Sequence, residues 1–73
     1  MVEISFGDLF RTNSDDTYHA ILTVAWGGVV MLQGGKYYHN EKLGGTPLAD
    51  LVDKRFKAKR LNGSSFQIIG IKN

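Results

Sequence analysis

The stretch TYHAILTVAWGGVVMLQGGKYYHN, residues 17–40, decides the fold of this chain. Over residues 17–26 apolar and aromatic side chains recur at every second position, and a period of two is typical of a β-strand. The β-branched and aromatic residues fit a pleated surface. We therefore expect one face of this strand to point into the core, and that face holds Tyr18, Ala20, Leu22, Val24 and Trp26.

The opposite face of this strand is partly apolar too, through Ile21 and Ala25, and Val29 and Met31 extend it into the next segment. A strand with two apolar faces either curls through a barrel or is half-covered by a partner. This outer face is therefore a candidate protein-interaction surface.

Two glycine pairs divide this region, and a third pair follows it. Two-residue glycine loops are typical of tight hairpins, because their turns need positive φ. Gly27-Gly28 and Gly34-Gly35 therefore predict an antiparallel meander of three strands, whereas Gly44-Gly45 ends a longer, more polar loop. A phosphate-binding P-loop is excluded, because Val30 stands where its first glycine belongs and Tyr37 stands where its hydroxyl residue belongs.

Alternation also marks residues 2–6, 55–61 and 66–71, and Asn62-Gly63 predicts a hairpin between the last two segments. In residues 47–54 the period changes to that of a short helix, with Thr46 as its N-cap and Pro47 in its first turn.

The expected fold is mainly β in a single small domain, residues 1–73. We predict a small antiparallel SH3-like barrel or a curled sheet, with one short helix near residues 47–54. An open sheet with the helix packed on one face is the alternative.

Composition narrows the class of protein. Of the 73 residues 42% are hydrophobic and 22% are charged, as in an ordinary globular protein, and there is no cysteine for a disulfide or a thiolate zinc site. We find no apolar run of the roughly 20 residues that span a bilayer, and no secretory signal pattern at the N-terminus. We therefore expect a cytoplasmic protein without a membrane partner.

Charge is distributed unevenly along the chain. Residues 1–53 carry a net charge of −4, and residues 54–73 carry +6 and no acid. As a strand, KRFKAKRL (residues 54–61) places alternate basic side chains on one face at intervals of roughly 7 Å, which suits a row of phosphates. The candidate nucleic-acid-binding residues are Lys54, Arg55, Lys57, Lys59 and Arg60, with Tyr38 as a stacking surface.

Two other functions compete with nucleic-acid binding. Lysines on an outer strand also keep a sheet soluble, without any ligand. The apolar outer face and the division of charge favour a protein-interaction or self-assembly module, of a kind that a phage could encode, that binds a protein partner or forms a homo-oligomer.

The sequence indicates no catalytic residue, metal site or cofactor. His19 and His39 lie near acids, but with no spacing that gathers three or four metal ligands. The serines Ser5, Ser14, Ser64 and Ser65 form no nucleophile elbow. We therefore expect a binding protein and not an enzyme.

GDLFR, YHAILTV and VVMLQGGKYYHN, within residues 7–40, form a combined pattern: Gly-Asp-x-aromatic, a strand led by Tyr, an apolar strand, then Gly-x-x-Tyr. It resembles a pattern in small uncharacterised proteins of phages and environmental sequence sets. The resemblance implies an SH3-like barrel and no established activity. The double glycine before Lys36 and the basic hairpin lie outside it.

Overall fold

The chain is mainly β, as predicted. In the computed structural model, which describes residues 1–72, 57% of the chain is strand and 10% is helical. The strands are β1 (Val2–Ser5), β2 (Phe10–Thr12), β3 (Thr17–Ala20), β4 (Thr23–Trp26), β5 (Val29–Met31), β6 (Lys36–Tyr38), β7 (Lys42–Leu43), β8 (Thr46–Pro47), β9 (Arg55–Asn62) and β10 (Ser65–Lys72). A single helical turn, α1 (Phe6–Leu9), and a 3-10 turn, η1 (Leu48–Asp50), complete the described elements.

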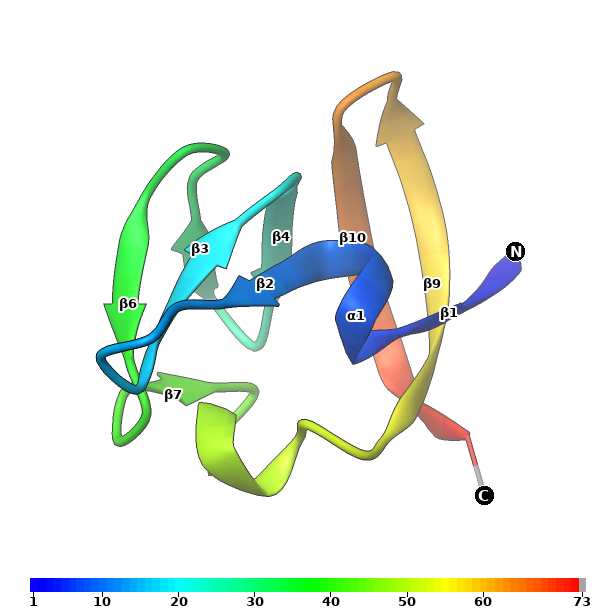
Figure 1. Cartoon of the computed structure of the whole chain (residues 1–73). Coiled ribbons are helices and arrows are strands. Elements are labelled where there is room, and N and C mark those ends of the chain that lie inside the picture. The colour runs from blue at the N-terminus through cyan, green and yellow to red at the C-terminus, as the bar shows by residue number, and fades with distance from the viewer. Residues whose placement is uncertain (73) are drawn as a thin grey trace.

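Within residues 1–72 the strands form three sheets (Figure 1). The largest has the order β1-β9-β10-β4-β5, the second has the order β2-β3-β6, and β7 pairs with β8. Neighbouring strands are antiparallel except for β10 and β4, which run parallel. Residues 1–72 make no closed barrel, so the curled-sheet form of the prediction fits. The radius of gyration, 10.9 Å, matches the roughly 11 Å expected of a compact chain of this length.

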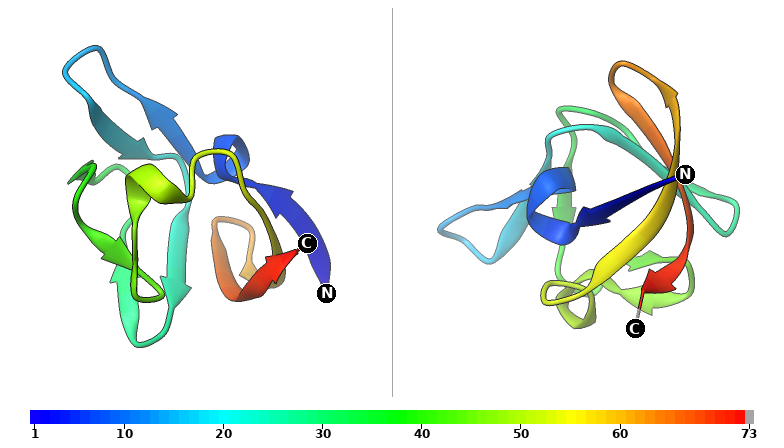
Figure 2. Two further views of the ribbon diagram at one scale, coloured as in Figure 1. Left: turned by 90° about the horizontal axis from the view of Figure 1, so that it is seen from below. Right: turned by 90° about the vertical axis from the view of Figure 1, so that its right-hand side faces the viewer.

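The long hairpin β9–β10 supplies the centre of the core. On β9 Phe56 and Ala58 point inward, and on β10 Phe66 and Ile68 meet them. The buried residues form one cluster: Ile4, Phe6, Leu9, Phe10, Tyr18, Ala20, Val24, Met31, Leu43, Leu48, Leu51, Phe56, Ala58, Phe66 and Ile68. Figure 2 shows that the turn between β2 and β3 and the tip of the β9–β10 hairpin extend away from this body.

The predicted long strand over residues 17–26 is two strands, because the chain changes sheet at Ile21 and Leu22. The backbone N–H of Ile21 donates to the carbonyl of Leu9 at 2.8 Å, and β4 then joins the five-stranded sheet. The predicted inward face is nevertheless confirmed: Tyr18, Ala20 and Val24 are buried, and Leu22 and Trp26 pack against the core.

The hairpin predicted at Gly27-Gly28 is confirmed. It joins β4 to β5, and both glycines have positive φ, 60° and 82°. The hairpin predicted at Gly34-Gly35 is wrong, because β6 pairs with β3 and not with β5. Ala20 explains the difference: its carbonyl accepts the N–H of Gly34, and its own N–H donates to the carbonyl of Gly35. These glycines therefore carry the chain from one sheet to the other.

The short helix expected near residues 47–54 is the 3-10 turn η1. Thr46 does not cap it, because Thr46 lies in β8. The backbone N–H groups of Leu48 and Ala49 donate to the carbonyls of Glu41 and His39, so the loop before β7 holds this segment in place.

The helical turn α1 was not foreseen, although its signal is present in the sequence. Ser5 and Asp8 have the spacing of a capping box, and the backbone N–H of Ser5 donates to Oδ2 of Asp8 at 2.9 Å. The turn buries Phe6 and Leu9. Phe6 stacks on Phe10, with ring centroids 4.8 Å apart.

Gly44-Gly45 is itself a hairpin turn, between β7 and β8, and the indole of Trp26 lies against it. A Cβ built on Gly44 would lie within 2.5 Å of several Trp26 ring atoms. Both glycines have positive φ, but a Cβ on Gly45 would have no neighbour within 4 Å in the described part of the chain. Glycine is therefore required at position 44 for two reasons: the backbone has positive φ, and the indole of Trp26 leaves no room for a side chain.

We predict that Gly44→Ala lowers the free energy of unfolding much more than Gly45→Ala. Positive φ alone costs alanine about 1 kcal/mol, which is the expected loss at Gly45. At Gly44 the displaced indole adds about 1–3 kcal/mol of overpacking. Urea unfolding of both variants, followed by Trp26 fluorescence, measures the difference. Equal losses would show that the indole does not need this contact.

A basic sheet face as the candidate functional site

The candidate site follows from the alternation of buried and exposed side chains along β9. Because Phe56 and Ala58 are buried, Lys57 and Lys59 must point to the opposite, outer face of the sheet, and both are exposed. Lys57 lies opposite Glu3 of β1 on one side and opposite Gly70 of β10 on the other. This outer surface of β9 and its neighbours is called the basic face below.

Glu3 is the acid of the basic face, and two cations share it. Its carboxylate accepts a hydrogen bond from Arg55 Nε at 2.7 Å and another from Lys72 Nζ at 2.5 Å. Hydrogen bonds from Lys72 and then Arg55 lower the pKa of Glu3 below its usual value. The charge of Arg55 is therefore partly balanced within the fold.

Lys57 and Lys59 form no ion pair with any residue of the described range 1–72. Their neighbours on β10 offer no acid, because Gly70 lies opposite Lys57 and Gln67 lies opposite Lys59. The carboxylate of Glu3, which is opposite Lys57 on β1, is already taken by Arg55 and Lys72. Two ammonium groups are thus displayed to solvent from one face of one strand.

The other predicted residues lie elsewhere. Arg60 stacks its guanidinium on the ring of Phe66, 5.0 Å from the ring centroid, so it lies on the inward side of β9. Lys54 precedes the strand, with Nζ 4.0 Å from a carboxylate oxygen of Asp53. Tyr38 is exposed on β6, which Figure 1 places on the other side of the molecule from β9. The structure therefore groups Arg55, Lys57 and Lys59 and separates Tyr38 from them.

Sequence reasoning missed two members of the basic face, Glu3 and Lys72. They are 69 positions apart in the chain, and they meet because β1 and β10 flank β9 on opposite sides. Simple alternation from Phe66 and Ile68 would place Lys72 on the inward face, and the bulge at Ile69 is what brings it to the outer face opposite Arg55.

On β5 the expected apolar outer face is shifted by one position. The turn at Gly27-Gly28 pairs Ala25 with Val30, so Val30 takes the outer position and is 55% exposed. Val29 pairs with Trp26 and Met31 pairs with Val24, so both lie on the side of the sheet that faces the core and their predicted place on the outer face is wrong. Leu32, which is 62% exposed, follows at the end of the strand.

Residues 1–72 offer no cluster of three or more His, Cys, Asp or Glu side chains arranged to hold a metal ion. The described surface also has no pocket. None of the helical segments in this range has the length and apolar character needed to cross a membrane.

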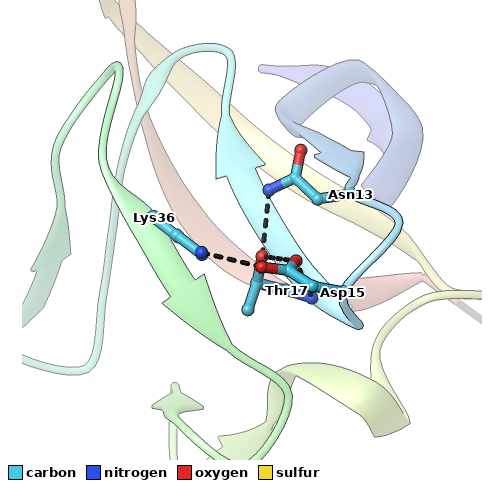
Figure 3. Close-up of polar contacts among 4 residues, drawn as sticks. All are labelled: Asn13, Asp15, Thr17 and Lys36. Carbon is cyan, nitrogen blue, oxygen red and sulfur yellow. Dashed lines mark hydrogen bonds and ion pairs between the residues drawn. The ribbon is translucent and has the colours of Figure 1, made fainter.

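A second polar cluster ties the β2–β3 turn to β6 (Figure 3). The carboxylate of Asp15 accepts hydrogen bonds from the hydroxyl and the backbone N–H of the buried Thr17, and Lys36 Nζ donates to its other oxygen at 2.8 Å. Asn13 Nδ2 donates to the Thr17 hydroxyl at 3.0 Å. Because these four side chains hydrogen-bond one another, we assign this cluster a structural role.

We predict that this cluster makes stability depend on pH. Hydrogen bonds from Lys36 and Thr17 lower the pKa of Asp15 from 3.8 to about 2. A carboxyl group with a lowered pKa contributes stability that is complete above pH 3.8 and is lost as the pH falls towards 2. Asp15→Asn should therefore destabilise the protein near neutral pH and lose less stability than the wild type on acidification.

Urea unfolding between pH 2 and pH 6 measures this effect. Asp16→Asn makes the same chemical change in the same turn, at a residue outside the cluster, and is the control. Identical pH profiles for the wild type and Asp15→Asn would contradict the assignment.

Comparisons of the chain with protein-family models, with curated proteins and with solved structures gave no match. The basis for a proposed function is therefore the geometry of the described residues.

Proposed function

We propose that this protein binds a polyanion, nucleic acid being the class that fits best, through the basic face, and that it does so without catalysis. The observation that carries the proposal is the pair Lys57 and Lys59. Both are exposed, both point to the same side of β9, and neither has an acid partner within residues 1–72. Phosphate contacts from such lysines supply most of the affinity in sequence-independent binding.

The spacing of the pair supports phosphate recognition. Alternate residues on one strand lie roughly 7 Å apart, which is similar to the separation of neighbouring phosphates on an extended nucleic-acid strand. The neutral neighbours on β10, Gly70 and Gln67, add no competing carboxylate beside the lysines. A nucleic-acid backbone could therefore run along β9 and contact both ammonium groups.

Arg55 at the start of β9 and Lys72 at the end of β10 extend the basic face, and they share Glu3. The three side chains together carry one net positive charge, because one acid is balanced against two bases. This end of the face attracts a polyanion, but the donor groups of Arg55 and Lys72 are already bound to Glu3. We therefore assign Arg55 and Lys72 a supporting role beside Lys57 and Lys59.

We predict that Lys57→Ser with Lys59→Ser removes two phosphate contacts. For a single-stranded oligonucleotide of mixed sequence, the slope of log affinity against log salt concentration should become shallower by about 1.4, since each contact contributes about 0.7. Fluorescence anisotropy over a salt series measures the slope.

A comparison of two single variants tests whether the effect depends on where the lost charge lies. Lys57→Ser and Lys42→Ser change the net charge equally, but Lys42 lies on β7, in a separate sheet. Equal effects of the two would show a general charge effect and contradict a site on the basic face. Absence of binding by the wild type at low salt would remove the proposal altogether.

We also predict that Glu3→Gln strengthens binding. It removes the acid of the basic face and leaves Arg55 and Lys72 without their shared partner. A surface charge interaction is worth about 0.2–1 kcal/mol, so affinity at low salt should rise roughly 1.5- to 5-fold. The same oligonucleotide titration with Asp16→Asn, an equal charge change in the β2–β3 turn, is the control. Unchanged or weaker binding by Glu3→Gln would contradict the predicted role of this face.

A protein-interaction module is the second candidate function. It is favoured by the β4–β5 hairpin, because residues 22–35 include no charged residue and Val30 and Leu32 are largely exposed. A partner held by these apolar side chains would bind with little dependence on salt. Salt dependence therefore separates this function from polyanion binding.

A further inference from the structure

In the five-stranded sheet, the C-terminal half of β10 is paired on one side only. β10 pairs with β9 along its length but with β4 only through Ser65–Gln67. Beyond that point the two strands diverge (Figure 1). On the side away from β9, residues 68–72 of β10 have no strand partner within the described range 1–72. We call this segment the free edge of β10.

The free edge is apolar, and beyond the buried Ile68 it is accessible. Ile69 is 50% exposed and Ile71 is 36% exposed. Lys72 is the charged residue of the segment, and its ammonium is already paired with Glu3. An accessible strand edge with unpaired backbone groups is a template for another strand.

Residues 68–71 of the free edge carry no charged side chain, and the charged residue of the segment, Lys72, is the last of β10. Edge strands β1, β2 and β6 each carry a charged side chain, namely Glu3, Arg11 and Lys36. The edge at β5 ends at Leu32, whose N–H is held by the hydroxyl of Tyr37 at 2.7 Å and whose carbonyl accepts the N–H of Gly35 at 2.9 Å. Charges and capped ends of this kind normally prevent strands from pairing between molecules.

We propose that the free edge of β10 binds the same segment of a second copy of this chain, as an antiparallel pair about a two-fold axis at Ile71. In this register Ile71 faces its own copy, and each Lys72 lies opposite a Gly70. The bulge at Ile69, which is skipped in the pairing with β9, leaves Gly70–Lys72 as the regular part of the edge.

The charges at the free edge favour a second copy of this chain over a charged peptide as the binding partner. The two-fold register brings no like charges opposite each other, and each Lys72 remains paired with Glu3 of its own chain. A charged peptide would find no free opposite charge on this edge. A copy of the same edge supplies an apolar side chain opposite an apolar side chain, as a self-complementary interface requires.

The proposed dimer is weak and does not depend on polyanion binding. Three regular residues of edge span only about 10 Å, well below the contact of a permanent dimer. Association should therefore appear as a rise in mean molar mass with concentration, from the 8.1 kDa of one chain towards twice that value. Lys57→Ser with Lys59→Ser should leave this rise unchanged, so the two proposals can fail separately.

Sedimentation velocity over a concentration series tests the proposal with Ile71→Lys and Val30→Lys. Ile71→Lys places two ammonium groups directly opposite each other and should weaken association at least about tenfold. Val30→Lys makes the same change on the edge strand β5, at a residue that is 55% exposed, and should have no effect.

Amide hydrogen exchange of the wild type gives a second readout that needs no variant. Exchange at residues 69–72 should slow as the concentration rises, while exchange at the β1 edge, residues 2–5, should not. A wild type that stays monomeric throughout overturns the proposal. The proposal is also overturned if Val30→Lys disrupts association and Ile71→Lys does not. It is overturned as well if the slowed exchange is confined to residues outside 69–72.

Discussion

Burial of the inner face of the β9–β10 hairpin is the interaction on which the rest of the structure depends. Phe56 and Ala58 on β9 are almost fully buried, and the ring of Phe56 meets the indole of Trp26 with centroids 5.9 Å apart. The same strand alternation that buries them exposes Lys57 and Lys59. A shift of one residue in the pairing of β9 would bury both lysines, at a large cost in desolvation. The pairing register of β9 with its neighbours therefore determines both which residues form the core and which form the basic face.

The features that could be predicted from the sequence are those set by neighbouring residues. The inward face of residues 17–26 was correct even though the strand is broken, because the side of a sheet on which a side chain lies follows from its own backbone. The hairpin at Asn62-Gly63 was also correct. There, Oδ1 of Asn62 accepts the N–H of Ser64 at 2.9 Å, which is a local turn contact.

The choice of partner strand could not be predicted, because it depends on contacts between distant residues. β6 follows β5 through a glycine pair and yet joins β3, since Ala20 hydrogen-bonds both glycines of the connection. The same limit applies to the candidate site. The sequence identified Lys57 and Lys59 on one face, but the partner of Arg55 is Glu3, 52 positions away. Arg60 belongs to the same basic run in the sequence, but its guanidinium stacks on Phe66, on the other side of β9 from Lys57 and Lys59.

The parallel contact between β10 and β4 explains why the strands curl without closing. It covers only Ser65–Gln67, and beyond it side chains replace strand pairing. Trp26 reaches from the end of β4 to Phe56 on β9, and the buried Leu48 and Leu51 come from η1 and the turn after it. The core is sealed there while the backbone edge of β10 stays open. A second strand could therefore pair with this edge beyond Gln67, where β4 no longer does.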